Sequence, residues 1–473
     1  MKKFFLLSAV TLGALLAAGA ASAGGPGMLI GATEDAVRQP TLVAAKAEMD
    51  LLTLAGFNAV RITQIWAPGE TEPAAADLTE LQNVEAAARL DGVTVMLGVT
   101  NFGSRTTPLT EDDRGQFAAY AAALARDLPG IRYFVIGNEP NLNRYWLPQF
   151  DPDGMDAAAP GYEALLAESY DALKAVSPKV NVLGGALSPH GSDDPANPRQ
   201  THSPTGFLID LGAAYRASGR TKPIMDAFAF HPYEDNSSID PMKGLHPNST
   251  TIALGDYGKL VTLLGQAFDG TMQRGSTLPI YDDEFGVETQ IPATKAGEYT
   301  GIEPSTVKPV TEPVQGQYYR DAVQLAFCQP NVRGLYLFHT VDESDLNRWQ
   351  SGLFYADGTP KSDLSYVRQA VMQAHRGTVT RCPGMALRPR AKLTVAGTRL
   401  RLACDIDCTY AILLRSGRRI VRRLTGTAVG AVAKTIRLGR LGPATYMLIA
   451  TLTAPLNPGR PRVVGLHFIV APR

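Results

Sequence analysis

The chain has few cysteines and little charge for its length. Of its 473 residues, four are cysteine and 19% are charged, while 45% are hydrophobic. This composition excludes a disordered chain, a collagen-like repeat, a coiled coil and a small scaffold held by disulfides. Basic and acidic residues number 45 each, so the sequence also lacks the positive excess typical of nucleic-acid-binding proteins. The length suffices for two or three ordinary domains, or for one large barrel and a smaller domain.

Long apolar runs are absent except at the start of the chain. Lys2 and Lys3 precede an apolar run over 4–18, and small residues at 21–23 offer a cleavage site before Gly24. We therefore expect residues 1–23 to be a signal peptide, with an uncleaved membrane anchor as the alternative. No cysteine follows the run directly, which excludes a lipid-anchored terminus. The mature protein is expected to be secreted, without membrane attachment.

Export makes the cysteines candidates for disulfide bonds. Four cysteines allow three pairings, of which we favour Cys328 with Cys382 and Cys404 with Cys408. A zinc site is the alternative, but no histidine near these cysteines completes a tetrahedral set. We expect no metal and no cofactor.

From residue 24 to about 377, short apolar runs alternate with longer segments of helical periodicity. The runs lie at 28–32, 59–63, 93–99, 133–137, 180–184, 227–231, 280–284 and 334–339. Strands that are apolar on both faces and are separated by helices indicate parallel βαβ units. Eight such units predict an α/β fold, a (β/α)₈ TIM barrel. A doubly wound open sheet is the alternative, but the glycine-rich turn that binds phosphate is missing after the first strand.

The pattern changes at about residue 378. Short strand-like runs follow at 392–395, 399–404, 410–414, 420–424, 435–438, 445–452 and 463–470. Turn residues separate them at intervals of roughly ten residues. Residues 378–473 are therefore expected to form an all-β, immunoglobulin-like sandwich that serves as an accessory domain.

Polar residues occur where three of the predicted barrel strands end. The fourth strand ends in Asn138-Glu139-Pro140, the sixth in His231-Pro232-Tyr233 and the seventh in Glu284-Phe285-Gly286. The carboxyl ends of barrel strands meet on one face, so two glutamates are expected to lie together there. Retaining glycoside hydrolysis requires such a pair: one carboxylate attacks the anomeric carbon, and the other protonates the leaving oxygen and later activates water.

These motifs, in this order, resemble the clan A retaining glycoside hydrolases, and most closely the cellulase-like family 5 and the xylosidase-like family 39. The resemblance covers the barrel and not the C-terminal region. It implies that Glu139 is the general acid/base and Glu284 the nucleophile. It further implies that Asn138 binds the sugar 2-hydroxyl.

The same resemblance assigns substrate-binding roles to His231 and Tyr233, which match the pair that lines the cleavage subsite. Arg61, at the end of the second strand, matches an arginine that orients the nucleophile. Two positions depart from the family pattern. Asp283 stands where many members have Thr or Ser, and Phe338-His339 stands where many have Trp.

Tryptophans in the loops after the strands are candidates for stacking on a sugar ring. Trp146 follows the fourth strand and Trp349 follows the eighth. Aromatic faces pack against the apolar face of a pyranose, but loop tryptophans also serve as ordinary core residues. We retain both as substrate-binding candidates.

The sequence therefore predicts a secreted retaining glycosidase that acts on a polysaccharide or glycoside. A non-catalytic carbohydrate-binding wall protein on a barrel scaffold is the main alternative, and a transglycosylase is a third possibility. Which sugar and linkage are cut stays open, because specificity depends on loop shape.

The balanced total charge conceals two opposite halves. Residues 376–473 contain 18 Lys and Arg but only Asp405 and Asp407 as acids, a net charge of +16, which leaves −16 for residues 1–375. One explanation of this asymmetry is that the two oppositely charged regions dock on each other and that the charged strand faces are solvated. Attachment of the C-terminal domain to an anionic cell-wall polymer is the other explanation.

Overall fold

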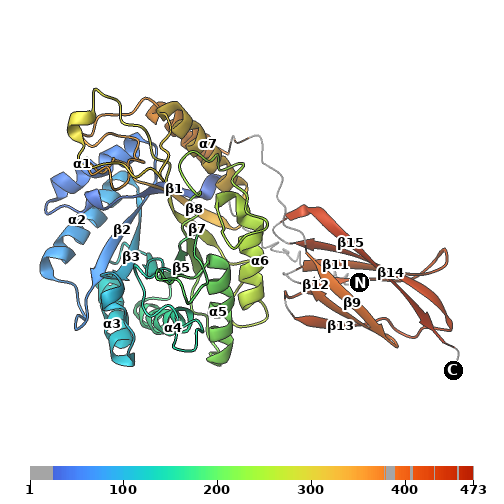
Figure 1. The fold of residues 1–473 in the computed structure, drawn as a ribbon. Coiled ribbons are helices and arrows are strands. Elements are labelled where there is room, and N and C mark those ends of the chain that lie inside the picture. Colours follow the sequence, from blue (N-terminus) through green and yellow to red (C-terminus); the bar gives the residue numbers. More distant parts are fainter. Residues whose placement is uncertain are drawn as a thin grey trace, which may run out of the picture.

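The computed structural model describes residues 25–377, 379, 389–404, 408–430, 432–454 and 457–471. The predicted signal peptide and Cys382 lie outside the described residues. Figure 1 shows a barrel wrapped by helices and, beside it, a separate group of strands.

Eight parallel strands close the barrel in sequence order, with β1 paired to β8. The predicted (β/α)₈ barrel is therefore confirmed. Its strands are β1 (Leu29–Thr33), β2 (Ala59–Trp66), β3 (Thr94–Asn101), β4 (Tyr133–Ile136), β5 (Asn181–Leu187), β6 (Ala227–Phe230), β7 (Ile280–Phe285) and β8 (Val332–Phe338). The helices around them are α1 (Leu42–Leu54), α2 (Ala75–Asp91), α3 (Glu111–Asp127), α4 (Ala158–Val176), α5 (Pro204–Ala217), α6 (Tyr257–Phe268), α7 (Glu312–Cys328) and α8 (Leu364–His375).

The strands are buried on both faces, which explains why they are apolar almost throughout. One face packs on the helices, and the other fills the barrel with side chains such as Met96, Val135 and Leu183. The interior is thus a packed core rather than a pore. It leaves the carboxyl ends of the strands as the face on which polar groups gather.

The C-terminal strands form two antiparallel sheets, as predicted. The three-stranded sheet has the order β13-β10-β9, and the four-stranded sheet the order β12-β11-β14-β15. Their bounds are β9 (Ala391–Ala396), β10 (Arg399–Cys404), β11 (Cys408–Ser416), β12 (Arg419–Ala428), β13 (Ala433–Arg437), β14 (Ala444–Ala454) and β15 (Asn457–Val470). Alternating residues such as Leu400, Leu402, Ile412 and Leu414 form the core of this sandwich.

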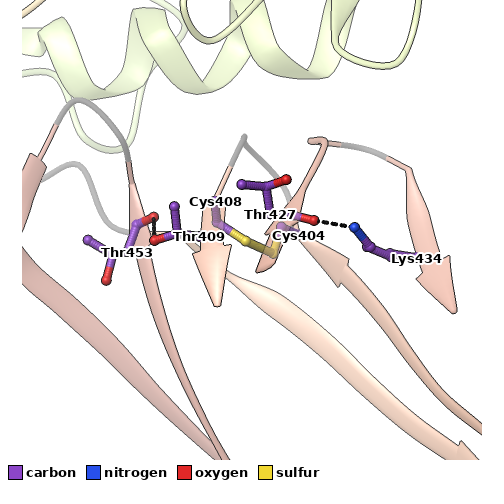
Figure 2. The surroundings of a disulfide bond; sticks show 6 residues. All are labelled: Cys404, Cys408, Thr409, Thr427, Lys434 and Thr453. Carbon is purple, nitrogen blue, oxygen red and sulfur yellow. Dashed lines mark hydrogen bonds between the residues drawn. A yellow bond between two sulfur atoms is a disulfide. The ribbon is translucent and has the colours of Figure 1, made fainter. Parts of the chain in front are cut away.

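A disulfide joins Cys404 to Cys408, which confirms that predicted pair. Figure 2 shows it linking the end of β10 to the start of β11, close to the hydrogen bond that Thr409 donates to the carbonyl of Thr453. Cys328 also belongs to a disulfide. Its predicted partner is not among the described residues, so that pairing stays a prediction.

The barrel and the sandwich touch through small apolar residues. Ala454, at the end of β14, belongs to the core cluster of the barrel. After α6, Gly270 lies so close to the Val432 side chain that a Cβ at this glycine would be 2.2 Å from Cγ2. In the described ranges, no helix is both long and apolar enough to cross a bilayer.

Candidate active site

Glu139 is held in an unusual backbone conformation just beyond β4. The strand ends at Ile136, and Gly137 then turns with φ +80°, where a Cβ would lie 3.1 Å from the Tyr162 ring. Glu139 itself has φ +40°, in a region that costs a non-glycine residue about 1–3 kcal/mol. Its amide donates to the carbonyl of Ala186 at 2.8 Å, which holds this turn against β5. The backbone thereby fixes the direction of the Glu139 side chain.

Glu284 lies at the end of β7, where two donors reach its two oxygens. Arg61, from β2, donates through Nη1 to Oε1 at 2.7 Å. The Tyr233 hydroxyl donates to Oε2 at 3.0 Å. Hydrogen bonds from a cation and a hydroxyl favour the ionised form of a carboxylate and fix its orientation.

His231 lies between the two glutamates. Its Nδ1 is 3.1 Å from Glu139 Oε1 and 3.5 Å from Glu284 Oε2. Glu139 Oε1 and Glu284 Oε2 therefore cannot be further apart than the sum of these distances, about 6.6 Å. For comparison, the two carboxyl groups lie about 5–5.5 Å apart in retaining glycosidases and about 6.5–9.5 Å apart in inverting ones. The structure thus brings the two predicted carboxylates to one place.

Asp283 lies beneath this pair, inside the barrel, with its side chain fully buried. Its Oδ2 is 2.9 Å from Arg61 Nε, and its Oδ1 is 3.6 Å from His231 Nε2. Burial opposes the charge on His231, but Glu284, Asp283 and the hydrogen bonds to Asp283 and Glu139 outweigh it and raise the pKa of His231 to about 10. Burial likewise opposes the charge on Arg61, and the same two carboxylates raise the pKa of its guanidinium.

Two further side chains complete the surroundings of the glutamates. Asn138 accepts a hydrogen bond from Arg61 Nη2 at 3.1 Å through Oδ1, so one guanidinium contacts both strand ends. Burial, together with the negative charge of Glu139, raises the pKa of Tyr145 to about 12. This phenol therefore stays neutral over the physiological range and can act as a hydrogen-bond donor near Glu139.

The structure separates the two candidate tryptophans. Trp349 is partly exposed, and its ring lies 4.9 Å from the Tyr233 ring and 5.2 Å from Phe338. Trp146 is only 1% exposed and packs edge-on against Tyr162 at 5.9 Å, beneath the loop that carries Glu139. The expectation that Trp146 contacts sugar is therefore wrong for this structure. The ring plugs the gap between that loop and α4.

A buried ion pair that no sequence pattern predicted supports the loop of Trp349. Lys361 and Asp342 have fully buried side chains, and Lys361 Nζ lies 2.8 Å from Asp342 Oδ1. The same ammonium group donates to Thr289 Oγ1 at 2.7 Å and to the carbonyl of Gln350 at 3.2 Å. These contacts join the loop after β7 to the loop after β8. A lysine three residues before α8 carried no signal in the sequence that its side chain is buried.

Among the described residues, no group of three or more His, Cys, Asp or Glu side chains is arranged to hold a metal ion. The carboxylates at the site face Arg61 and His231 instead. The arrangement is that of two glutamates held by organic cations and hydroxyl groups.

Comparisons with known proteins find similarity in structure alone. No protein-family model matches the chain, and no curated protein matches its sequence. One similar solved structure is a family 39 glycoside hydrolase from Bacteroides cellulosilyticus WH2, with 15% identity, a TM-score of 0.51, and coverage of 87% of this chain and 81% of the other. Another is a glucosidase from Croceicoccus marinus, with 12% identity, a TM-score of 0.50, and coverage of 91% and 97%. At these identities the likeness is one of fold, and it agrees with the barrel type that the motifs implied.

Proposed function

We propose that this protein is a retaining glycoside hydrolase that cleaves O-glycosidic bonds by double displacement. The observation that carries the proposal is the pair Glu139 and Glu284, both within 3.5 Å of the Nδ1 atom of His231. Their motifs resemble those of clan A enzymes, and the fold is shared with solved glycoside hydrolases. No single one of these three observations would suffice.

In the first step, Glu284 attacks the anomeric carbon while Glu139 gives its proton to the departing oxygen. Arg61 and Tyr233 favour this role for Glu284, because both donate to its oxygens and fix the direction of the carboxylate. In the second step, Glu139 accepts a proton from water, which attacks the glycosyl-enzyme and releases Glu284. Asn138 is proposed to contact the sugar 2-hydroxyl, and Trp349 to stack on the ring.

Two variants test these roles on nitrophenyl glycosides and polysaccharides. E139Q and E284Q should each lower kcat by about 10²-fold or more, because a proton-transferring group contributes about 10²–10⁴-fold. Azide should restore turnover to E139A by attacking the glycosyl-enzyme in place of water, which gives a glycosyl azide with the configuration of the substrate and releases Glu284. E298Q, which changes an exposed glutamate, is the matched control. Full activity in both site variants would end the assignment, and sugar binding without hydrolysis would favour the carbohydrate-binding alternative.

We further propose that the protein is exported and that its sandwich binds an anionic cell-wall polymer. The basis for export is the leader-like segment at 1–23, and the basis for binding is one sheet face. On β9, β10 and β13, alternate residues share a side, and this side carries Lys392, Arg399, Arg401 and Arg437. All four are exposed.

Arg399 stands directly opposite Arg437 in the β10–β13 register. Like charges in that position destabilise a sheet, so folding alone gives no reason for them. The described part of the sandwich contains no acidic residue to neutralise them. A polymer bearing regularly spaced carboxylates would neutralise these positive charges.

Retention on immobilised polygalacturonate at rising NaCl concentration tests this face. The intact protein should bind at low salt and elute as screening increases. The triple variant R399Q/R401Q/R437Q should elute at lower salt. The variant R418Q/R419Q/R440Q removes the same charge from exposed positions outside the three strands and should behave much like the parent. Equal behaviour of the two triple variants, or no retention at low salt, would leave docking and solvation as the explanation.

A further inference from the structure

The site holds one more carboxylate than double displacement requires. Glu139 and Glu284 have proposed roles, whereas Asp283 has none and does not reach the surface. Its backbone carbonyl accepts from Thr33 Oγ1 at 2.6 Å, which ties the end of β7 to β1. Among the described residues, its side chain lies at ion-pair distance from Arg61 and His231 alone.

His231 is in contact with carboxylates through both of its ring nitrogens. Nδ1 faces Glu139 and Glu284, and Nε2 faces Asp283. Ionised carboxylates only accept hydrogen bonds, and a neutral imidazole has only one N–H. A neutral His231 would therefore direct a lone pair either at Glu284 or at Asp283, whereas the doubly protonated ring points an N–H at each of these two carboxylates.

We propose that Asp283 is a positioning residue that keeps His231 doubly protonated between the two catalytic glutamates. The role of the glutamates rests on the function proposed above, whereas the pairing of Asp283 with His231 stands on geometry alone. As a cation, His231 directs its Nδ1 proton at Glu139 Oε1, an oxygen that can accept it while the other oxygen of Glu139 carries the catalytic proton, and it keeps the two glutamates at a fixed separation. Without Asp283, the ring would be free to lose the Nε2 proton and to turn.

The other charged and titratable groups around His231 also act on it. Arg61 from β2 opposes a second positive charge on His231, whereas Glu139 and Glu284, at the ends of β4 and β7, favour that charge. Tyr233, which follows β6, is a neutral neighbour because burial and Glu284 raise its pKa. With Asp283 neutralised, Arg61 keeps Glu284 as its carboxylate partner but loses the second one, so its positive charge is less compensated. Both changes favour the neutral imidazole in the variant.

Histidine-selective NMR titration tests the proposal on the intact protein without any need for turnover. In the parent, His231 should stay doubly protonated well above pH 8, in accord with a pKa raised to about 10 by the carboxylates that outweigh burial. In D283N its pKa should fall by about 1–3 pH units, the effect of removing a neighbouring opposite charge. H231Q identifies the signal. The profile of kcat/KM against pH for D283N should gain an alkaline limb at the new value, and D283E should partly restore the parental profile.

D282N is the matched control. Asp282 is the neighbouring residue on β7, but its side chain is buried among Phe230, Tyr257 and Leu260, on the side of the strand that faces α6. This variant should leave the His231 titration unchanged. A parental His231 that titrates near its ordinary value of about 6.5 would overturn the proposal, and so would D283N with an unaltered titration or an equal shift in D282N. Failure of the glycosidase assignment would appear instead as undiminished turnover in E139Q and E284Q.

Discussion

At the scale of single residues, burial decides which of two similar side chains can meet a substrate. Trp146 and Trp349 both follow barrel strands at the face that carries the glutamates, and the sequence treats them alike. The ring of Trp146 fills space against Tyr162 and α4, whereas Trp349 stays partly exposed and stacks on Tyr233. The difference arises from how each loop folds back on the barrel.

Alanine substitution should separate these two tryptophans. W146A removes a fully packed ring and should lower the free energy of unfolding by about 3–5 kcal/mol, as large core truncations do. W349A leaves the core intact, so its unfolding midpoint should stay close to that of the parent while KM rises on the preferred glycoside. Urea unfolding and steady-state kinetics on both variants check this. A stability loss in W349A as large as that in W146A would show that Trp349 is also a packing residue.

At the scale of elements, the sequence was sufficient to predict the strands of the barrel sheet, but it was insufficient to predict how the loops fold and contact each other. Short apolar runs, separated by segments of helical periodicity, identify all eight barrel strands, because a strand covered on both faces is largely apolar. The motif residues Glu139, His231 and Glu284 could be placed because each ends such a strand. Asp283 could not be interpreted, since its partners Arg61 and His231 come from β2 and from the end of β6, and meet it only when the barrel closes.

The loop after β7 is tied to its neighbour rather than free. Thr289 pairs with Val310 within this loop, and Thr300 pairs with Asp345 of the loop after β8. Tyr299 donates to Asp342 Oδ2 at 2.8 Å, the carboxylate that Lys361 also contacts. These contacts hold the loop that carries Trp349 against the barrel.

K361M should loosen both loops together. It leaves the Asp342 carboxylate buried without its cation, and breaking a buried pair in this way costs about 3–5 kcal/mol. We expect faster hydrogen exchange in residues 286–311 and 340–355 and a higher KM. The double variant K361M/D342N removes both charges and should recover part of the loss. Losses that simply add in the double variant would contradict this coupling.

At the scale of the whole molecule, an acidic barrel and a basic sandwich share one chain, and the barrel buries several carboxyl groups. Burial is the first cause of the raised pKa in each of these groups: Asp156, Glu234, Asp282, Glu288 and Asp363. A carboxyl group that binds its proton more tightly in the folded state than in the unfolded state stabilises the fold at low pH and loses that contribution as pH rises. The barrel should therefore lose stability as pH rises from about 4, where these groups titrate in the unfolded chain, through their raised pKa values, which run from about 6 for Asp156 to about 9 for Glu234.

Glu234 offers the clearest test of this dependence. It is 9% exposed, and neither carboxyl oxygen has a hydrogen-bond partner among the described residues. Burial and the charges of Asp256, Asp235 and Asp240 raise its pKa to about 9, whereas the unfolded chain titrates near about 4.3. Between these values the native state holds one extra proton, so stability should fall with rising pH by up to about 1.4 kcal/mol per unit.

E234Q keeps the shape of the protonated side chain and removes its titration. Calorimetric Tm values for E234Q and the parent should be similar near pH 5 and should diverge as pH rises toward 9, with the variant the more stable. The exposed Glu72 provides the control, since E72Q should follow the parental curve. His231 also loses stabilising charge at high pH, but it does so in all three proteins and cancels in the comparison. A constant difference between E234Q and the parent across this range would mean that Glu234 is already ionised in the folded barrel.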